Sequence, residues 1–338
     1  MDRIRVGGQH RAKVGIVGAG AVGAAAALST CVRGVAREVV LIDRDFARAK
    51  GVATDLRYGS PLSPAVEVRA GDYDDLAGAG LVVITAGINE KAGGATDRND
   101  PLGRLRLLHT NVGIFEDIVP KIVTAAPDAV ILIVTNPPEP LVDLTCRLAG
   151  HNRVMSTSTF LDTLRFRVHV AERFGVSPQS VDAYVISEHG TFSVFLWSSA
   201  RVGGKPVTEM VAERGIPFDE FRRSVEHDVR FANISIIEGI GASQYGIGMV
   251  IARVAECVLR DEGAVIPVGS YQPRYSVTLS LPSAVGSSGV AEVLWPRLSE
   301  EEQRGVEASA ERLKGIVDRY VGVGDRLPSA PARLAQIS

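Results

Sequence analysis

The stretch Lys13-Val14-Gly15-Ile16-Val17-Gly18-Ala19-Gly20-Ala21-Val22-Gly23 decides the fold of this chain. Its first five residues predict a short buried strand, and the helix-forming residues 24–29 follow the turn. Gly18, Gly20 and Gly23 form a GxGxxG pattern, which permits a tight turn and lets the main chain approach a pyrophosphate. The N-terminus of the helix then faces the anion, so Ala21 and Val22 are expected at the same site.

The next strand supports this interpretation. Residues 38–42 are mostly apolar and end at Asp43, 20 residues after Gly23, where a carboxylate would accept hydrogen bonds from an adenosine ribose. An acid at this position disfavours a 2′-phosphate and predicts NAD in preference to NADP, although Arg44 could soften that preference. The alternative is a glycine-rich turn that binds nothing.

Further apolar runs at regular spacing predict an α/β fold, a Rossmann-type doubly wound parallel sheet with helices on both faces. The expected strands are 66–69, 81–85, 130–135 and 154–156, and the expected helices are 44–57 and 105–125. Ligands of such sheets bind outside the carboxyl ends of the strands. Two strand ends therefore become cofactor candidates, namely Thr85-Ala86-Gly87 and Thr135-Asn136.

From residue 157 the pattern changes to a mixture of helices and β-like runs, which predicts an α+β substrate domain. Its expected helices are 161–174, a long one from about 219, 247–260 and 299–320, and its expected strands are 181–186, 194–200, 264–268 and 275–280. The predicted organisation is a disordered tail (1–12), an NAD-binding domain (13–156), a catalytic domain (157–325) and a loosely ordered tail (326–338).

The composition excludes several functional classes. The chain has 338 residues, 46% of them hydrophobic and 22% charged, with a net charge of −2 that offers no electrostatic attraction for nucleic acid or an anionic membrane. Cys31, Cys146 and Cys257 lie far apart and form no metal-ligand pattern, which indicates buried thiols in a reducing compartment and no metal. Without an apolar leader or a run of membrane-spanning length, the chain is expected to be soluble and cytoplasmic.

Three residues suggest chemistry. Asp162 and Arg165 are three apart, so they share one face of a predicted helix. His189 follows 27 residues after Asp162, behind an apolar run. Together the three would give an oriented proton donor beside a carboxylate clamp. Each also has a structural interpretation, a surface ion pair for the first two and a buried histidine for the third.

Read in order, these motifs resemble those of the lactate/malate dehydrogenase family across roughly residues 13–322. The motifs are GAGAVG followed by Asp43, TAG at 85–87, TNP at 135–137, LDTLR at 161–165 and EHG at 188–190. The resemblance implies that His189 exchanges a proton with the substrate oxygen, that Asp162 orients its ring, and that Arg165 binds the substrate carboxylate. It also implies that Asn136 lies between nicotinamide and substrate, that Asn111 lies at the cofactor, and that Ser243 stands where the family usually has Thr.

The segment after Gly87 resembles the family's mobile active-site loop but looks about half a dozen residues longer. Arg104 matches the arginine that polarises the substrate carbonyl when the loop closes. Glu90 matches the position that selects the substrate. A carboxylate there would repel the distal carboxylate of oxaloacetate by about 4 kcal/mol at 4 Å and an effective dielectric constant near 20. The implied 2-oxo acid is therefore not oxaloacetate but one with a cationic or hydrogen-bond-donating side chain. Alternatively, Glu90 pairs with Lys91 or Arg98 and never faces the substrate.

Smaller departures affect the surroundings of the predicted site. Ser187 stands where the family commonly has Gly, Thr191-Phe192 replaces Asp-Ser, and Pro138-Glu139-Pro140 is expected to stiffen a turn after Asn136. The leading interpretation is an NAD-dependent oxidoreductase that interconverts a 2-hydroxy and a 2-oxo acid, as a homo-oligomer (dimer or tetramer) with apolar helical residues 246–259 as a candidate interface. The alternatives are reduction of a 2-imino acid, a catalytically idle dinucleotide-binding sensor or scaffold, and an NAD-dependent glycosidase that would need a metal.

Overall fold

The computed structural model describes residues 12–88 and 105–321. The predictions for both tails, apart from residue 12, and for nearly all of the long active-site loop lie outside these ranges. The strands are β1 (Lys13–Val17), β2 (Glu38–Ile42), β3 (Glu67–Ala70), β4 (Leu81–Ile84), β5 (Val130–Ile133), β6 (Val154–Ser156), β7 (Val181–Asp182), β8 (Val185–Ile186), β9 (Val194–Phe195), β10 (Arg201–Val202), β11 (Lys205–Pro206), β12 (Ala264–Gln272), β13 (Val277–Gly286) and β14 (Gly289–Val293). The α-helices are α1 (Ala21–Val32), α2 (Phe46–Gly59), α3 (Leu105–Ala125), α4 (Pro138–Ala149), α5 (Phe160–Phe174), α6 (Val207–Glu213), α7 (Phe218–Ile240), α8 (Tyr245–Leu259) and α9 (Glu300–Tyr320).

The central sheet has the strand order β14-β13-β12-β6-β5-β4-β1-β2-β3. Its pairs from β6 to β3 are all parallel. The strand order reverses between β1 and β4, and in such sheets the crevice at the reversal is where ligands bind. The α/β, Rossmann-type prediction is confirmed.

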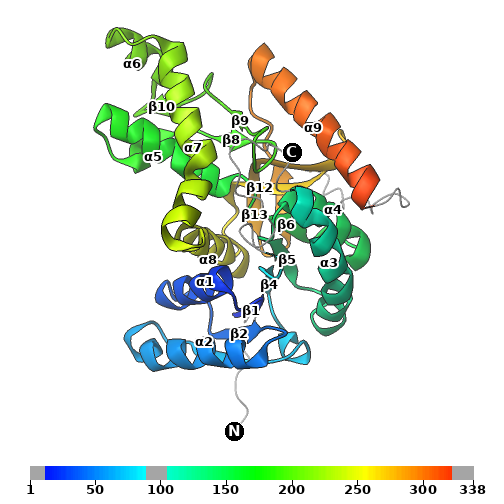
Figure 1. Ribbon diagram of the computed structural model, residues 1–338. Helices are drawn as coiled ribbons and strands as arrows, with labels where there is room; N and C mark the ends of the chain where they lie inside the picture. The colour runs from blue at the N-terminus through cyan, green and yellow to red at the C-terminus, as the bar shows by residue number, and fades with distance from the viewer. Residues whose placement is uncertain (1–11, 89–104, 322–338) are drawn as a thin grey trace, which may run out of the picture.

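Alternate side chains of the central strands enter two different cores. Ile16 of β1 and Val83 of β4 pack with α1, α2 and α8 on one face, while Val17 and Ile84 pack with α3, α4 and α9 on the other. Figure 1 shows α1 beside α8 on one side of the sheet, and α3 with α4 on the other. Because both faces are buried, these strands are nearly continuous apolar runs instead of alternating with polar residues.

The C-terminal half of the chain extends the same sheet. Strands β12, β13 and β14 join it as antiparallel neighbours, and β12 meets β6 through the pair Gly269 and Ser156. Helices α5, α6 and α7 pack around a separate aromatic core that contains Phe166 and Trp197. The predicted strand pair near 264–280 exists and is longer than expected, but the sequence did not indicate that it joins the parallel sheet. The domain limits stay a prediction.

Three local predictions were wrong. Residues Pro138-Glu139-Pro140 do not extend a turn but begin α4, because a proline in the first helical turn lacks only an N–H that would have no partner there. The run 181–186 is not one strand: β7 pairs with β10, and β8 pairs with β9 in another sheet. The run 194–200 keeps only β9. Short strands with changing partners cannot be separated by composition alone.

Candidate active site

The glycine turn has the shape that its sequence predicts. Gly18 has φ +108°, and a Cβ there would lie 2.6 Å from the Ala86 nitrogen. A Cβ at Gly23 would lie 1.8 Å from the Gly18 carbonyl oxygen, so α1 can approach β1 only without a side chain at this position. A Cβ at Gly20 would meet nothing within 4 Å. The turn therefore presents an open main-chain surface at the N-terminus of α1, which suits the pyrophosphate of a dinucleotide.

Asp43 is bonded to this turn. Its Oδ2 accepts a hydrogen bond from the Ala19 N–H at 2.8 Å, and its Oδ1 accepts one from the Asp45 N–H at 2.9 Å. The Asp43 side chain is only 9% exposed and Arg48 lies 3.9 Å away. The carboxylate thus ties the end of β2 to the glycine turn. A carboxylate has about four acceptor positions, so these two bonds leave acceptor capacity for the predicted bond to a ribose, which stays a prediction.

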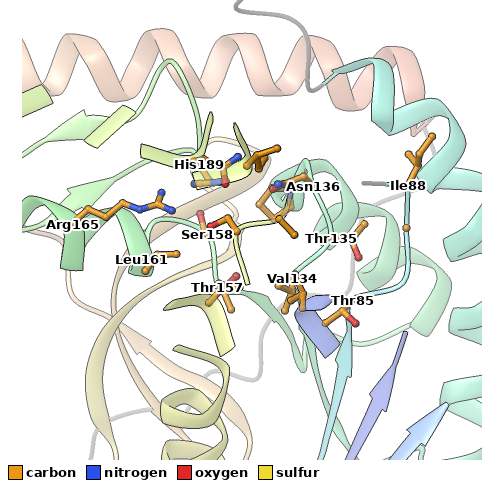
Figure 2. A pocket seen from close by; sticks show the side chains of 18 of the residues that line it. Thr85, Ile88, Val134, Thr135, Asn136, Thr157, Ser158, Leu161, Arg165 and His189 are labelled. Atoms are coloured by element: carbon orange, nitrogen blue, oxygen red, sulfur yellow. The ribbon is translucent and has the colours of Figure 1, made fainter. Parts of the chain in front are cut away.

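The ends of β4 and β5 form the floor beside the turn. Thr85 donates to the Gly18 carbonyl at 2.7 Å, and Thr135 donates to the Ala86 carbonyl at 2.8 Å. A Cβ on Gly87 would lie 2.4 Å from Thr135 Cγ2, so these segments meet closely only with glycine there. Figure 2 shows Thr85, Thr135 and Asn136 along the same cleft. These residues fit one side of a bound dinucleotide.

Asn111 lies behind this floor. It is fully buried, its Oδ1 accepts from the Ile88 N–H at 2.9 Å, and its Nδ2 donates to the Asn136 carbonyl at 2.7 Å. The carboxamide therefore joins the ends of β4 and β5 through their main chains. Its predicted contact with the cofactor stays a prediction.

The three residues predicted for chemistry meet. Asp162 is 6% exposed, its Oδ2 lies 2.5 Å from His189 Nδ1, and its Oδ1 accepts from Arg165 Nη1 at 2.9 Å. In Figure 2 the Arg165 guanidinium and the His189 ring lie at the same end of the cleft. One buried carboxylate thus orients an imidazole and a guanidinium together. Because Nδ1 is engaged by Asp162, Nε2 is the ring nitrogen directed away from the carboxylate and suited to proton transfer.

A second face of α5, beginning at its N-cap residue Thr159, holds the strand that leads to His189. Thr159 donates to the Val185 carbonyl at 2.6 Å, and Thr163 accepts from the Val185 N–H at 3.0 Å. Thr159 Oγ1 also lies 2.7 Å from Ser280 Oγ of β13. Two threonines spaced by four share a helix face, which is a signal that the sequence contained and that our prediction missed.

Ser187, two residues before His189, has an unusual backbone conformation. It has φ +82°, is fully buried, and its main chain exchanges hydrogen bonds of 2.8 and 2.7 Å with Ser280. Its hydroxyl has no hydrogen-bond partner among the described residues. A positive φ favours glycine, because glycine has no Cβ to clash in this conformation. This is a physical reason for the glycine that the family commonly has here, and Ser187 departs from it.

The segment after His189 packs on α9. The Arg312 guanidinium carbon lies 3.6 Å above the centre of the Phe192 ring, and Glu188 Oε1 accepts from the Phe192 N–H at 3.3 Å. Burial lowers the pKa of Arg312, with Glu188 opposing that shift. The Phe192 departure therefore forms a cation–π contact with α9.

The cleft joins the two groups of residues. Its lining from the dinucleotide side and from the catalytic side comprises Val22, Thr85, Gly87, Ile88, Val134, Thr135, Asn136, Pro138, Thr157, Ser158, Leu161, Arg165, His189, Asn233, Ile237, Gly241, Ala242, Ser243 and Ile247. Ser243 is one of these lining residues, and its predicted contact with the substrate stays a prediction. Asn233, 7% exposed on α7, is a polar lining residue that our sequence reasoning missed, because nothing in α7 indicated which face meets the cleft.

Two predicted site residues, Glu90 and Arg104, lie outside the described residues, as does Arg98. Among the residues described, no group of three or more metal-ligating side chains occurs. Within the same ranges no single helix is long and apolar enough to cross a membrane; α7 and α8 meet that test only as a pair, bent by 119° at their junction.

A dinucleotide turn that shares one cleft with a carboxylate-oriented imidazole and a guanidinium defines an NAD-dependent dehydrogenase. Family models agree: the NAD-binding domain of lactate/malate dehydrogenase matches residues 12–156, and its α/β C-terminal domain matches residues 159–322. The chain belongs to the lactate/malate dehydrogenase family. It is an oxidoreductase that uses NAD to interconvert a 2-hydroxy acid and a 2-oxo acid.

Individual relatives are similar over nearly their whole length. The chain is 44% identical to an L-lactate dehydrogenase of Thermus aquaticus over 312 residues, covering 90% of this chain and 97% of that protein. It is 43% identical to one of Chloroherpeton thalassium over 305 residues, covering 89% and 97%. Two solved structures share the fold, a lactate dehydrogenase from a Medee basin deep-sea metagenome library (TM-score 0.84, 30% identity, 92% and 99% covered) and a minor L-lactate dehydrogenase from Enterococcus mundtii (TM-score 0.83, 34% identity, 90% and 97% covered).

Proposed function

We propose that this protein reduces a small 2-oxo acid to the L-2-hydroxy acid and catalyses the reverse reaction, with pyruvate and L-lactate as the leading substrate pair. The observation that carries the proposal is that Asp162 binds both His189 and Arg165 at one end of the dinucleotide cleft. Several relatives, including those of Chloroherpeton thalassium and Thermus aquaticus, are named L-lactate dehydrogenase, which supports pyruvate as the first substrate to test.

Each member of this group has a distinct proposed role. The Arg165 guanidinium binds the substrate carboxylate through two parallel hydrogen bonds, a geometry that lysine cannot provide. His189 donates a proton from Nε2 to the substrate oxygen during reduction and accepts it during oxidation. Asp162 holds the ring in one tautomer and stabilises its cationic form. Asn136 and Ser243 complete the substrate side of the cleft.

The cofactor is proposed to lie along the glycine turn and the ends of β4 and β5. When bound, NAD supplies the hydride chemistry of the reaction. Gly18, Gly20, Ala21, Val22 and Gly23 form the pyrophosphate surface. Asp43 accepts hydrogen bonds from the adenosine ribose, and Thr85, Ala86, Gly87 and Thr135 form the floor beneath the cofactor, with Asn111 behind it.

The loop residues add two proposals that follow from the resemblance alone. Arg104 polarises the substrate carbonyl, and Glu90 disfavours oxaloacetate by charge repulsion. If Glu90 faces the substrate, a 2-oxo acid with a cationic or hydrogen-bond-donating side chain should compete with pyruvate. A 2-imino acid remains a second candidate, because the same carboxylate clamp and proton donor suit it. A protein that binds the dinucleotide and is catalytically idle needs neither Asp162 nor Arg165 arranged in this way.

The setting of the enzyme is proposed from weaker observations. Cys31, Cys146 and Cys257 are all buried free thiols, which is consistent with the reducing cytoplasm. Tyr245 and Met249 of α8 expose more than half of their side-chain surface, which supports α8 as part of a homo-oligomer interface. The proposed domain division remains 13–156 and 157–325.

The test is a screen of NADH oxidation with pyruvate, oxaloacetate, a basic 2-oxo acid and ammonia plus pyruvate. We expect the highest kcat/KM with pyruvate, and we expect His189→Asn to abolish that activity. The ratios of kcat/KM between these substrates should then be compared in wild type and Glu90→Gln. Unchanged ratios would remove the selectivity role of Glu90 without affecting the reaction class. Binding of NADH without turnover of any substrate would favour the idle-protein alternative.

A further inference from the structure

Glu139 is a buried carboxylate that contacts the main chain of the proposed proton donor. It occupies the first turn of α4, three residues after Asn136, and is 1% exposed. Its Oε1 accepts a hydrogen bond from the His189 N–H at 2.9 Å. His189 is therefore held at two points, at its ring by Asp162 and at its backbone by Glu139.

The same oxygen also holds a wall of the cleft. Ser158 lines the cleft and donates its hydroxyl to Glu139 Oε1 at 2.5 Å. Ser158 has φ +36°, a conformation that L-residues rarely adopt and that surrounding contacts must maintain. One oxygen atom thus links α4, the segment before α5, and the segment that carries His189. These three segments come from positions far apart in the sequence, and all border the reaction site.

We propose that Glu139 is a positioning residue that sets the place of the His189 ring through the backbone N–H of His189. The inference rests on the proposed proton-transfer role of His189. Its physical basis is that the reach of the ring depends on where its own main chain lies. An error of about 1 Å in a reacting group can cost about 100-fold in rate.

The acceptor oxygen, and not a full negative charge, should be what matters. Burial raises the pKa of Glu139, with the bonds from Ser158 and His189 opposing that shift. An amide oxygen at the same place can accept both hydrogen bonds. Glu139→Gln should therefore retain function, whereas Glu139→Ala leaves the His189 N–H and the Ser158 hydroxyl without this acceptor.

Asp143 provides a matched control. It lies one turn further along α4, is 3% exposed, and accepts hydrogen bonds from Thr278 at 2.6 and 3.3 Å. It is also a buried carboxylate, but its partner lies in β13 and not in a segment of the reaction site. Asp143→Ala should disturb the core of α4 as Glu139→Ala does without moving His189.

The experiment compares kcat, KM for pyruvate, Kd for NADH and the isotope effect of NADH deuterated at the transferred position. For Glu139→Ala we expect kcat to fall about 10- to 100-fold with a larger isotope effect and unchanged NADH affinity. Glu139→Gln and Asp143→Ala should stay within about threefold of wild type. An Ala variant at 139 with wild-type kcat, or an equal loss in Asp143→Ala, overturns the proposal. A Gln variant as impaired as the Ala variant overturns it too.

A second measurement covers the case in which Glu139→Ala does not fold. Residue-resolved amide hydrogen exchange in wild type and Glu139→Gln should show a protected His189 amide in both. Exchange of that amide at the rate of an exposed loop would contradict the proposal. This outcome is independent of the proposed function, which fails separately if wild type turns over no 2-oxo acid or if His189→Asn keeps full activity.

Discussion

Asp162 Oδ2 and His189 Nδ1 lie 2.5 Å apart, although the two residues are 27 positions apart in the chain. The carboxylate is buried and also receives a hydrogen bond from Arg165, so it does not need to rearrange before it can stabilise an imidazolium. Preorganised charge of this kind acts most strongly where water is excluded. The pair is the structural basis of the first prediction.

Asp162→Asn should reduce kcat/KM for pyruvate by about 100- to 10,000-fold, because the amide can favour the wrong histidine tautomer and carries no charge. The Kd for NADH, measured by fluorescence, should change less than twofold, since the contacts proposed to hold the dinucleotide are made by the glycine turn, Asp43 and the ends of β4 and β5. The control is Asp182→Asn, an exposed carboxylate in the same half of the protein that lies 3.8 Å from Arg167. Wild-type kcat/KM in Asp162→Asn would exclude the orienting role.

Arg165→Lys should raise KM for pyruvate more than it lowers kcat. Lysine keeps the charge but loses the planar pair of donors, and one lost charge-assisted hydrogen bond is worth about 1.5–3 kcal/mol, or roughly 10- to 150-fold. Steady-state kinetics with varied pyruvate at saturating NADH measure this split. Arg33→Lys, which keeps a cation beside the buried carboxylate of Glu256, is the control and should leave KM and kcat for pyruvate unchanged. A change in kcat alone would place Arg165 away from the substrate carboxylate.

Asp43→Ala should weaken NADH binding by about tenfold or more, because the glycine turn loses the acceptor of the Ala19 N–H and the ribose loses its proposed partner. The ratio of NADPH to NADH affinity should rise, since an anion no longer repels a 2′-phosphate. Asp45→Ala is the matched control: Asp45 caps α2 through the Arg48 N–H, so its loss should lower stability by about 1 kcal/mol without affecting NADH. If the two variants weaken NADH binding equally, the role of Asp43 is structural and it does not contact the ribose.

Ser187→Gly should stabilise the protein. Relief of the positive φ is worth about 1–2 kcal/mol, and the greater freedom of glycine in the unfolded chain offsets about 0.5–1 kcal/mol of it. Removing a buried hydroxyl that lacks a partner among the described residues adds to the gain. Urea unfolding measures the change. Ser276→Gly, at an exposed residue with φ +54°, isolates the backbone contribution and should gain less. A destabilised Ser187→Gly would mean that the hydroxyl has a role in the folded state.

Asp143→Asn should change how stability depends on pH. Burial raises the pKa of Asp143 from 3.8 to about 7. Between these values the folded state binds the proton and the unfolded state does not, so the stability contributed by Asp143 falls as pH rises from about 4 to 7. In Asp143→Asn this fall in the free energy of unfolding should be absent, which urea unfolding at several pH values across that range would measure. Hydrogen bonds from the Asp72 main chain and Arg69 lower the pKa of Asp75, so the stability that Asp75 contributes rises with pH. Asp75→Asn should remove that rise. Parallel pH profiles of wild type and Asp143→Asn would show that Asp143 is not buried as a neutral acid.

Much of the architecture was predictable from local patterns. Strand β1 and its glycine turn, the acid at the end of β2, and the apolar runs of β4 and β5 determine a parallel sheet with helices on both faces. This works because strand period, turn residues and the N-terminus of a helix are all properties of neighbouring residues. The spacing of Asp162 and Arg165 likewise indicated one shared helix face. Their meeting with His189 was predicted only with the help of the ordered family motifs.

What the tertiary structure alone decided depends on contacts between segments distant in the chain. Nothing near Glu139 indicates that its oxygen accepts from His189, 50 positions later, or from Ser158. The antiparallel strands β12 to β14 could have formed a sheet of their own, and the pairing of Gly269 with Ser156 joins them to β6. A local pattern specifies the conformation of a segment, but the partner of a buried polar atom is chosen by the packing of the whole chain.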